Sequence, residues 1–359
     1  MRLQKPAIAV LAFAVLGVSG CSTLGYYWQS VSGHLELMNA ARPLPEWLGD
    51  SQTPEKLKAK LELAQRIRSF AVSELHLPDN ASYQRYVDLQ RKAVVWNVTA
   101  SPALSLKPET WCFPVAGCVG YRGYFDEKEA RAEAARLQAR GLDVHVYGVP
   151  AYSTLGWMNW AGGDPLLSTF VVYPEGDLAR LIFHELAHQV VYVQDDTPFN
   201  ESFATAVERL GVARWLAASG SDKARADYAA LEQQRLQFRT LSQDTRRSLT
   251  AIYESKTSPA LSRQAQIAMK NIALEDFRER YAELRKSWAV PAGSIGGYDR
   301  FVAQANNASF GAQAAYDDLV PGFETLFARS GGNWQAFYDE VRQLASLSKD
   351  ERLKQLAAR

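Results

Sequence analysis

The residues best suited to catalysis lie in the segment His184-Glu185-Leu186-Ala187-His188. Two histidines four apart project from the same face of a helix, so His184 and His188 can share one metal ion. Glu185 lies beside the first histidine, where it can act as a general base toward a metal-bound water. The alternative is a pair of structural histidines at the edge of a core. We expect a single zinc ion here.

A catalytic zinc ion usually has three protein ligands and a water molecule. The positions where a metzincin has a glycine and a histidine are Val191 and Gln194 here, which excludes that class. A loop after Gln194 leads to a second predicted helix that carries Glu201. A carboxylate in the first turn of a returning helix can face the histidines, so Glu201 is the predicted third ligand. Its alternative role is a favourable interaction with the helix dipole.

Two further residues are candidates for supporting roles. Glu208 lies seven residues after Glu201, on the same helix face, and is predicted to orient the histidines. Asp195 and Asp196 are alternatives for this role, and a solvated helix face explains Glu208 equally well. Tyr316 is the candidate donor to the oxyanion, and an ordinary packing aromatic is its alternative.

These residues require particular elements to position them. The spacing of apolar residues predicts a helix from Asp177, as N-cap, to about Val193. Residues 167–173 read as a strand, whose edge could accept an extended peptide. Upstream, the pattern predicts a helix over 54–75, strands over 93–99, 118–125 and 142–149, and a helix over 126–140.

The predicted fold is therefore α+β, with a small β-sheet region flanked by helices, a zincin-like metal helix and a helical C-terminal region. Residues 1–20 are expected to be a signal peptide and 21–92 a lipid anchor with an N-terminal helical region. Residues 93–220 would form the catalytic region, and 221–359 a helical region packed on it.

The first residues have the pattern of an export signal. Arg2 and Lys5 precede the uncharged run Ala7–Val18, which is too short to span a bilayer but suits a signal-peptide core. Val18-Ser19-Gly20-Cys21 resembles a bacterial lipobox, which implies cleavage before Cys21 and lipid attachment to it. An ordinary signal followed by an incidental cysteine is the alternative. We expect an exported lipoprotein of the cell envelope, anchored at the outer membrane and facing the periplasm.

The cysteines and the net charge indicate the state of the thiols and the class of partner. Outside the cytoplasm, Cys112 and Cys118 are predicted to form a disulfide, with two free thiols as the alternative. The net charge is only +1 and the sequence contains no block of basic residues. Both features argue against nucleic acid as a partner. The 47% of hydrophobic residues is enough to bury a large core.

The segment Asn200 to Ala204 resembles the Asn-Glu-x-x-Ala signature of gluzincins, the zinc peptidases with a glutamate ligand. More widely, Pro150 to Leu216 resembles a bacterial family of predicted aminopeptidases, many of them lipoproteins. The motifs that carry this resemblance are Tyr152–Trp157, Asp164–Thr169, His184–Gln189 and Asn200–Glu208, with weaker matches at Gly117–Tyr121 and Asn306–Ala308.

The resemblance implies zinc-dependent hydrolysis of peptide bonds next to a free N-terminus. The Gly-x-Met-Glu-Asn segment with which large gluzincin aminopeptidases hold the substrate ammonium is missing from this sequence, and Asp164 is a guess for that role. Alternatives are a zinc endopeptidase, a trimmer of cell-wall peptides, or a lipid-anchored scaffold without turnover. The expected partners are peptides and, through Cys21, a membrane.

Overall fold

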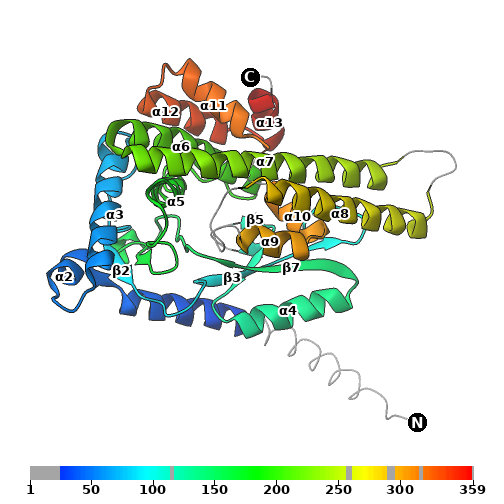
Figure 1. Cartoon of the computed structure of the whole chain (residues 1–359), viewed down its shortest axis with the longest axis horizontal. Coiled ribbons are helices and arrows are strands. Elements are labelled where there is room, and N and C mark those ends of the chain that lie inside the picture. Colours follow the sequence, from blue (N-terminus) through cyan, green and yellow to red (C-terminus); the bar gives the residue numbers. More distant parts are fainter. Residues whose placement is uncertain (1–24, 114–116, 256–260, 289–295, 315–317, 358–359) are drawn as a thin grey trace, which may run out of the picture.

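The computed structural model describes residues 25–113, 117–255, 261–288, 296–314 and 318–357. These residues form a predominantly helical α+β fold, which confirms the predicted fold class (Figure 1). Cys21 and Tyr316 lie outside the described residues, as does the predicted signal peptide.

The described part of the chain begins with a helix over residues 25–40, followed by β1 (Arg42–Pro43), α2 (Leu44–Gly49) and α3 (Glu55–Ser73). A small sheet has the order β1-β2-β8, with β2 at Arg85–Val87 and β8 at Leu166–Leu167. Strand β2 is antiparallel to β1 and parallel to β8. This sheet links the N-terminal helices to the segment just before the proposed metal helix.

A second sheet has the order β6-β3-β7, formed by Arg122–Tyr124, Val95–Pro102 and Leu142–Val149. Helix α4 (Glu127–Ala139) covers one face, where Val98 and Ala100 join its alanines in a small core. Side chains alternate between the two faces along a strand. On β3, the residues that point to the other face are the polar Asn97, Thr99 and Ser101. One of these, Thr99, contacts α10 (Asn307–Ala314), and the hydroxyl of Tyr147 on β7 accepts a hydrogen bond from Asn97.

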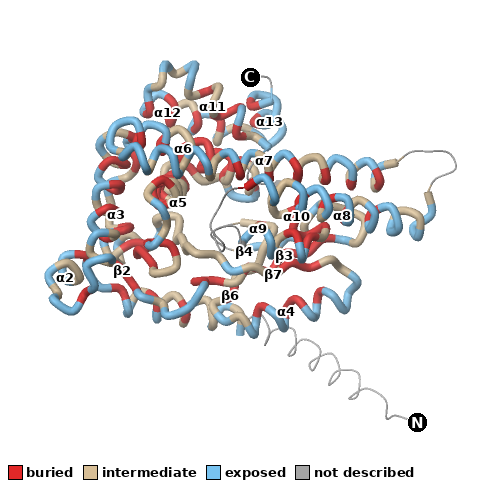
Figure 2. Tube along the Cα trace, viewed as in Figure 1, coloured by how far each residue is buried: buried red, intermediate tan, exposed pale blue. Residues whose placement is uncertain are grey.

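The largest core surrounds α5 (Glu175–Ala187) and α6 (Thr197–Ser219), which pack closely together. It extends to α3 and to the C-terminal helices α11 (Val320–Arg329), α12 (Trp334–Ala345) and α13 (Lys349–Ala357). Figure 2 shows the buried positions on α5, the central helix of this group. Both proposed metal helices are therefore held within the largest core of the described residues.

A separate core joins the long hairpin of α7 (Asp222–Tyr253) and α8 (Arg263–Lys286) to α9 (Gly296–Ala303) and α10. Asn306 and Asn307 fasten α10 to the sheet, because their side-chain amides donate to the carbonyls of Val144, Pro102 and Ala103. The motif at Asn306–Ala308 thus has a structural function.

The prediction of a strand over 167–173 is wrong. Only Leu166–Leu167 pairs as β8, and the chain then turns, with the Phe170 and Val171 amides donating to the Leu167 carbonyl. Phe170 and Val171 are buried. A short apolar run fits a buried turn as well as a strand. The edge strand β8 has only two residues, and residues 168–173 do not extend it.

The observed metal helix begins and ends closer to the N-terminus than predicted. Helix α5 follows Pro174 and ends with His188 as its C-cap, while Asp177 lies in its first turn and pairs with Arg235. The residues after it are mostly β-branched, Val190, Val191 and Val193, and such residues are stiff and less favourable in helices. The predicted strand over 118–125 is also divided, into β5 (Gly117–Val119) and β6.

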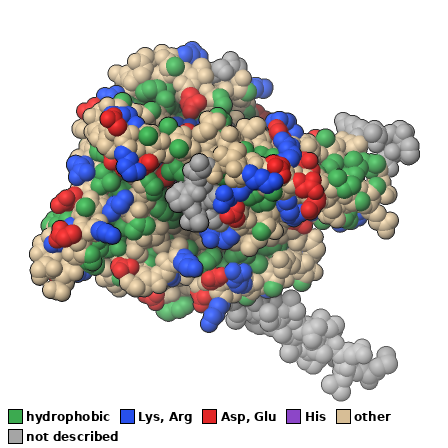
Figure 3. Space-filling model, viewed as in Figure 1, with side chains coloured by type: hydrophobic (Ala, Val, Ile, Leu, Met, Phe, Trp, Pro, Cys, Tyr) green, Lys and Arg blue, Asp and Glu red, His purple; other side chains and the backbone are tan. Residues whose placement is uncertain are grey.

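Among the described residues, no helix combines the length and apolarity needed to cross a bilayer. On the face in Figure 3, the basic and acidic side chains are interspersed.

Candidate metal centre

Three side chains with metal-ligating atoms converge between α5 and α6. The Nε2 atoms of His184 and His188 are 3.2 Å apart, and a Glu201 carboxylate oxygen lies 3.3 Å from the first and 3.7 Å from the second. All three side chains are largely buried. Among the described residues, this trio is identified as a group able to hold a metal ion.

The separations fit a zinc ion. A tetrahedral ion with Zn–N distances of about 2.0–2.1 Å keeps its ligand atoms about 3.3–3.4 Å apart. The measured 3.2 Å between the two imidazole nitrogens is close to this separation. The donor set of two imidazoles and one carboxylate is also one that catalytic zinc uses.

Local sequence explains how Glu201 reaches the histidines. Asn200 is buried, and its side-chain amide both accepts from the Val193 amide at 2.8 Å and donates to the Val193 carbonyl at 2.7 Å. These two hydrogen bonds close the loop between the two helices. Glu201 then falls in the second turn of α6, since the helix begins at Thr197; the expectation of the first turn is wrong by one turn.

Glu208 contacts His184 directly. One Glu208 oxygen lies 3.0 Å from Nδ1 of His184, and the other accepts from Nε of Arg180 at 2.8 Å. A carboxylate is only an acceptor when ionised, so Nδ1 must carry the proton, and the Nε2 lone pair is left for a metal. Arg180 was missed in the sequence, although it lies four residues before His184 on the same helix.

The carboxylates are ionised in the metal-free site. Burial acts to raise the pKa of Glu201, but His188 and His184 outweigh it and lower that pKa to about 2. Burial likewise opposes the shift of Glu208, whose pKa Arg180 and His184 lower to about 2. Burial lowers the pKa of His184, yet hydrogen bonds to Glu201 and Glu208 raise it well above the ordinary value. Arg180 and the protonated His184 balance the charges of the two carboxylates, and a metal ion bound at Nε2 would replace the His184 proton.

A tyrosine that the sequence did not single out is affected by the charges of this centre. Burial raises the pKa of Tyr121 well above its ordinary value, and the nearby Glu201 carboxylate raises it further, with Tyr147, Tyr192 and Glu185 adding to the effect. Tyr121 therefore keeps its proton and can donate a hydrogen bond. Its only signal in the sequence is its place in one of the weaker motifs.

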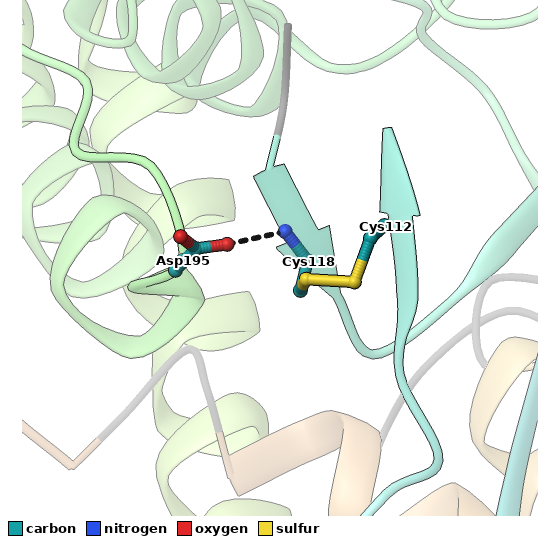
Figure 4. Close-up of a disulfide and its surroundings, with 3 residues drawn as sticks. All are labelled: Cys112, Cys118 and Asp195. Atoms are coloured by element: carbon teal, nitrogen blue, oxygen red, sulfur yellow. Dashed lines mark hydrogen bonds between the residues drawn. A yellow bond between two sulfur atoms is a disulfide. The ribbon is translucent and has the colours of Figure 1, made fainter. Parts of the chain in front are cut away.

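The disulfide hairpin brings Tyr121 to this place. Cys112 and Cys118 are bonded, as predicted, and join β4 (Trp111–Phe113) to β5 (Figure 4). The Cys118 amide donates to Asp195 Oδ1 at 2.6 Å, on the loop between α5 and α6. Gly117 has φ +72°, and a Cβ there would lie 2.8 Å from the Asp195 nitrogen. Only glycine permits this approach of the hairpin to the loop.

The next residue, Asp196, anchors the same loop from the other side. It is 2% exposed, and one of its oxygens accepts from Arg352 of α13 at 2.8 and 3.0 Å. The side chain of Asp195 thus binds the hairpin, and that of Asp196 pairs with Lys349 and Arg352 of α13, so both residues hold the loop.

Asp164 lies at the base of a neighbouring polar network. It is 1% exposed, and its carboxylate accepts from the Thr154 amide at 3.0 and 3.1 Å and from the Ser153 hydroxyl at 3.4 Å. Burial raises its pKa to about 6. Asp164 therefore holds the loop that begins at Ser153, which leaves little reason to assign it to a substrate ammonium.

A family model described as "Putative aminopeptidase" matches residues 25–356, which is nearly all of the chain. The chain belongs to this family. Membership supports a peptidase function in general terms, and the match extends well beyond the proposed metal helices. No curated protein and no solved structure matches the chain.

Proposed function

We propose that the protein is a zinc-dependent peptidase that removes residues from the free N-terminus of peptides. The observation that supports this most is the convergence of His184, His188 and Glu201, with Glu185 next to the first histidine. Family membership supports the peptidase class, and the preference for a free N-terminus depends on the family description alone.

In this proposal, zinc is held by His184, His188 and Glu201, while Glu208 fixes the His184 ring. A bound zinc ion supplies Lewis-acid activation of the attacking water and of the scissile carbonyl. Glu185 accepts the proton of that water and delivers it to the leaving amine. The charge of Glu185 raises the pKa of both the Tyr121 and the Tyr83 hydroxyl.

Tyr121 is the proposed donor to the oxyanion, in place of Tyr316, which lies outside the described residues. The Tyr121 hydroxyl keeps its proton, because burial and the charges of Glu201 and Glu185 raise its pKa. A donor of this kind stabilises charge that develops only in the transition state.

Glu185→Gln tests the peptidase proposal. We expect the variant to keep its zinc and to lose at least about 10²-fold in kcat, because the general base is removed and the ligands are not. Zinc content would be measured by atomic absorption, and amino-acid release from unblocked and N-acetylated peptides by chromatography. Cleavage of blocked peptides as well would change the assignment to endopeptidase. Absence of zinc from the parent protein would refute the proposal.

Tyr121→Phe tests the donor. We expect kcat to fall by about 10²–10³-fold with little change in KM, since a hydrogen bond made in the transition state is lost. Tyr253→Phe removes a hydroxyl that bonds Asn307 in the C-terminal region, and it should leave kcat unchanged. Equal, small effects of the two substitutions would remove Tyr121 from the mechanism.

We also propose that the protein is exported and carries lipid on Cys21. The support is the lipobox-like segment Val18–Cys21 behind a short apolar run, together with the disulfide between Cys112 and Cys118, which suits an oxidising compartment. Mass spectrometry of the membrane-extracted protein would test this directly.

A further inference from the structure

The helix over residues 25–40 carries an exposed apolar stripe. Tyr27 is 40% exposed, Trp28 74%, Val31 54% and Leu35 51%. Residues three, four and seven apart lie on one helix face, so these four side chains form a continuous row. We call Tyr27, Trp28, Val31 and Leu35 the N-terminal stripe.

The opposite face of this helix is fixed to the body of the protein. The Tyr26 ring packs on Tyr124 with centroids 5.4 Å apart and lies under the Arg122 guanidinium at 4.0 Å. The Gln29 side chain accepts from the Phe125 amide at 3.0 Å. At Gly33, a Cβ would collide with the ring of Phe125. The helix therefore cannot rotate to bury the stripe without breaking these contacts.

The stripe also lacks charge. From Ser22 to Leu35 the sequence has no Asp, Glu, Lys or Arg, whereas an exposed helix face in water is normally rich in them. On α4, by contrast, Lys128, Glu129 and Arg131 are exposed. Tryptophan and tyrosine beside aliphatic residues are typical of a helix that lies in the boundary between headgroups and acyl chains.

The position of the stripe relative to Cys21 identifies the surface that it faces. Only four peptide steps separate Cys21 from Gly25, where the helix begins, and four extended residues span at most about 14 Å. Lipid on Cys21 would therefore hold the first turn of this helix next to the surface of the bilayer.

We infer that the N-terminal stripe inserts into the surface of the bilayer that holds the Cys21 lipid. The lipid supplies the anchorage, and the stripe fixes the orientation of the protein on the membrane. Because the stripe is uncharged, the contact depends on apolar burial and does not require anionic lipid. This inference rests on the proposed lipid on Cys21, and it is independent of the peptidase chemistry.

The test uses the full chain, purified from membranes and reconstituted in neutral phosphatidylcholine vesicles. A nitroxide is placed at Val31→Cys, and the matched control is Ile272→Cys on α8, an aliphatic residue that is 69% exposed. Power saturation then compares access to oxygen, which is enriched in the bilayer, with access to a water-soluble nickel complex. We expect the Val31 label alone to gain oxygen access and lose nickel access on reconstitution.

Three other outcomes would overturn the inference. Aqueous access at both labels would show that the stripe does not enter the bilayer. Dipolar broadening between Val31 labels on separate copies would show that a second copy of the chain covers it. An unmodified Cys21, seen as the mass of the intact protein, would remove the premise without affecting the Glu185→Gln result.

A second measurement isolates the stripe from the lipid. The chain from Ser22 onward retains all described residues, and its partition onto neutral vesicles can be followed by flotation. Replacing both Trp28 and Val31 by Glu should lower this partition at least about tenfold, since each side chain loses apolar burial. Ile272→Glu should leave it unchanged, and equal partition of all three proteins would contradict the role of the stripe.

Discussion

At the scale of residues, the two glutamates of α6 contact different nitrogens of the His184 ring. Glu201 faces its Nε2 atom and Glu208 its Nδ1 atom. Arg180 then pairs with Glu208, so that the carboxylate remains ionised and the imidazole keeps one tautomer. These contacts connect Arg180, four residues before His184 on α5, to the imidazole nitrogen that we propose as a zinc ligand.

Glu208→Gln should lower zinc affinity by about 10–100-fold, because the imidazole loses the carboxylate that orients it and raises its basicity. Affinity would be measured by competition with a chromogenic chelator at fixed pH. The matched control is Glu324→Gln on α11. Glu324 is partly exposed and pairs with Arg209 of α6. Unchanged affinity in Glu208→Gln would mean that Glu208 has only a structural function.

Sequence reasoning located the residues whose spacing is local. His184 and His188 are one helical turn apart, and Glu201 and Glu208 are two turns apart, so a helix places each pair without knowledge of the fold. Tyr121 could not be located in this way. Its position depends on a hairpin contact with Asp195, which is 77 residues from Cys118 in the chain.

At the scale of elements, the disulfide hairpin works as a support for the loop between α5 and α6. The bond between Cys112 and Cys118 holds β4 against β5, and the Cys118 amide then meets Asp195. Asp195 has φ +64°, a conformation that non-glycine residues adopt at some cost. The hairpin contact helps to offset that cost.

Replacing Cys112 and Cys118 by Ser should destabilise the protein by about 2 kcal/mol, as expected for a disulfide that closes a short loop. It should also reduce kcat/KM, because Tyr121 follows the hairpin directly. Unfolding in urea and peptide turnover would be measured in parallel. Asp195→Ala keeps the disulfide and breaks only the contact with the loop, so it should lower turnover as well. Full activity in both variants would argue that the hairpin does not position Tyr121.

Element boundaries were predictable where composition changes sharply. The strand at Leu142–Val149 was predicted with its observed limits, and α4 to within a residue, because a charged helix ends at Gly141 beside a β-branched strand. The run after Leu167 was not, because its burial by neighbouring elements allows a turn as well as a strand. The end of α5 was also placed too late, because the apolar spacing of the valines after His188 outweighed their low preference for helix.

At the scale of the whole molecule, the last helix of the chain contributes to the candidate metal centre. Arg352 and Asp196 are 6% and 2% exposed, and they form an ion pair between α13 and the loop between α5 and α6. Such a pair contributes little net stability when intact, but removal of one partner leaves a buried charge uncompensated.

Arg352→Met should therefore destabilise the protein by about 3 kcal/mol and lower its zinc affinity, since the loop before Glu201 loses its anchor. Thermal unfolding with and without zinc would be compared with that of Arg342→Met, which removes an exposed pair on α12. The control should change little. A double variant with Asp196→Asn should regain part of the loss, and no recovery would imply that Arg352 acts through packing.

The separation of 156 residues between Asp196 and Arg352 has a consequence for biosynthesis. A nascent chain that ends before α13 already contains every proposed zinc ligand and the general base, yet its loop has only one of its two anchors. The completed chain must therefore leave the ribosome before the centre is fully formed. Premature termination near the C-terminus should produce a protein with the proposed catalytic motif and a weakened metal site.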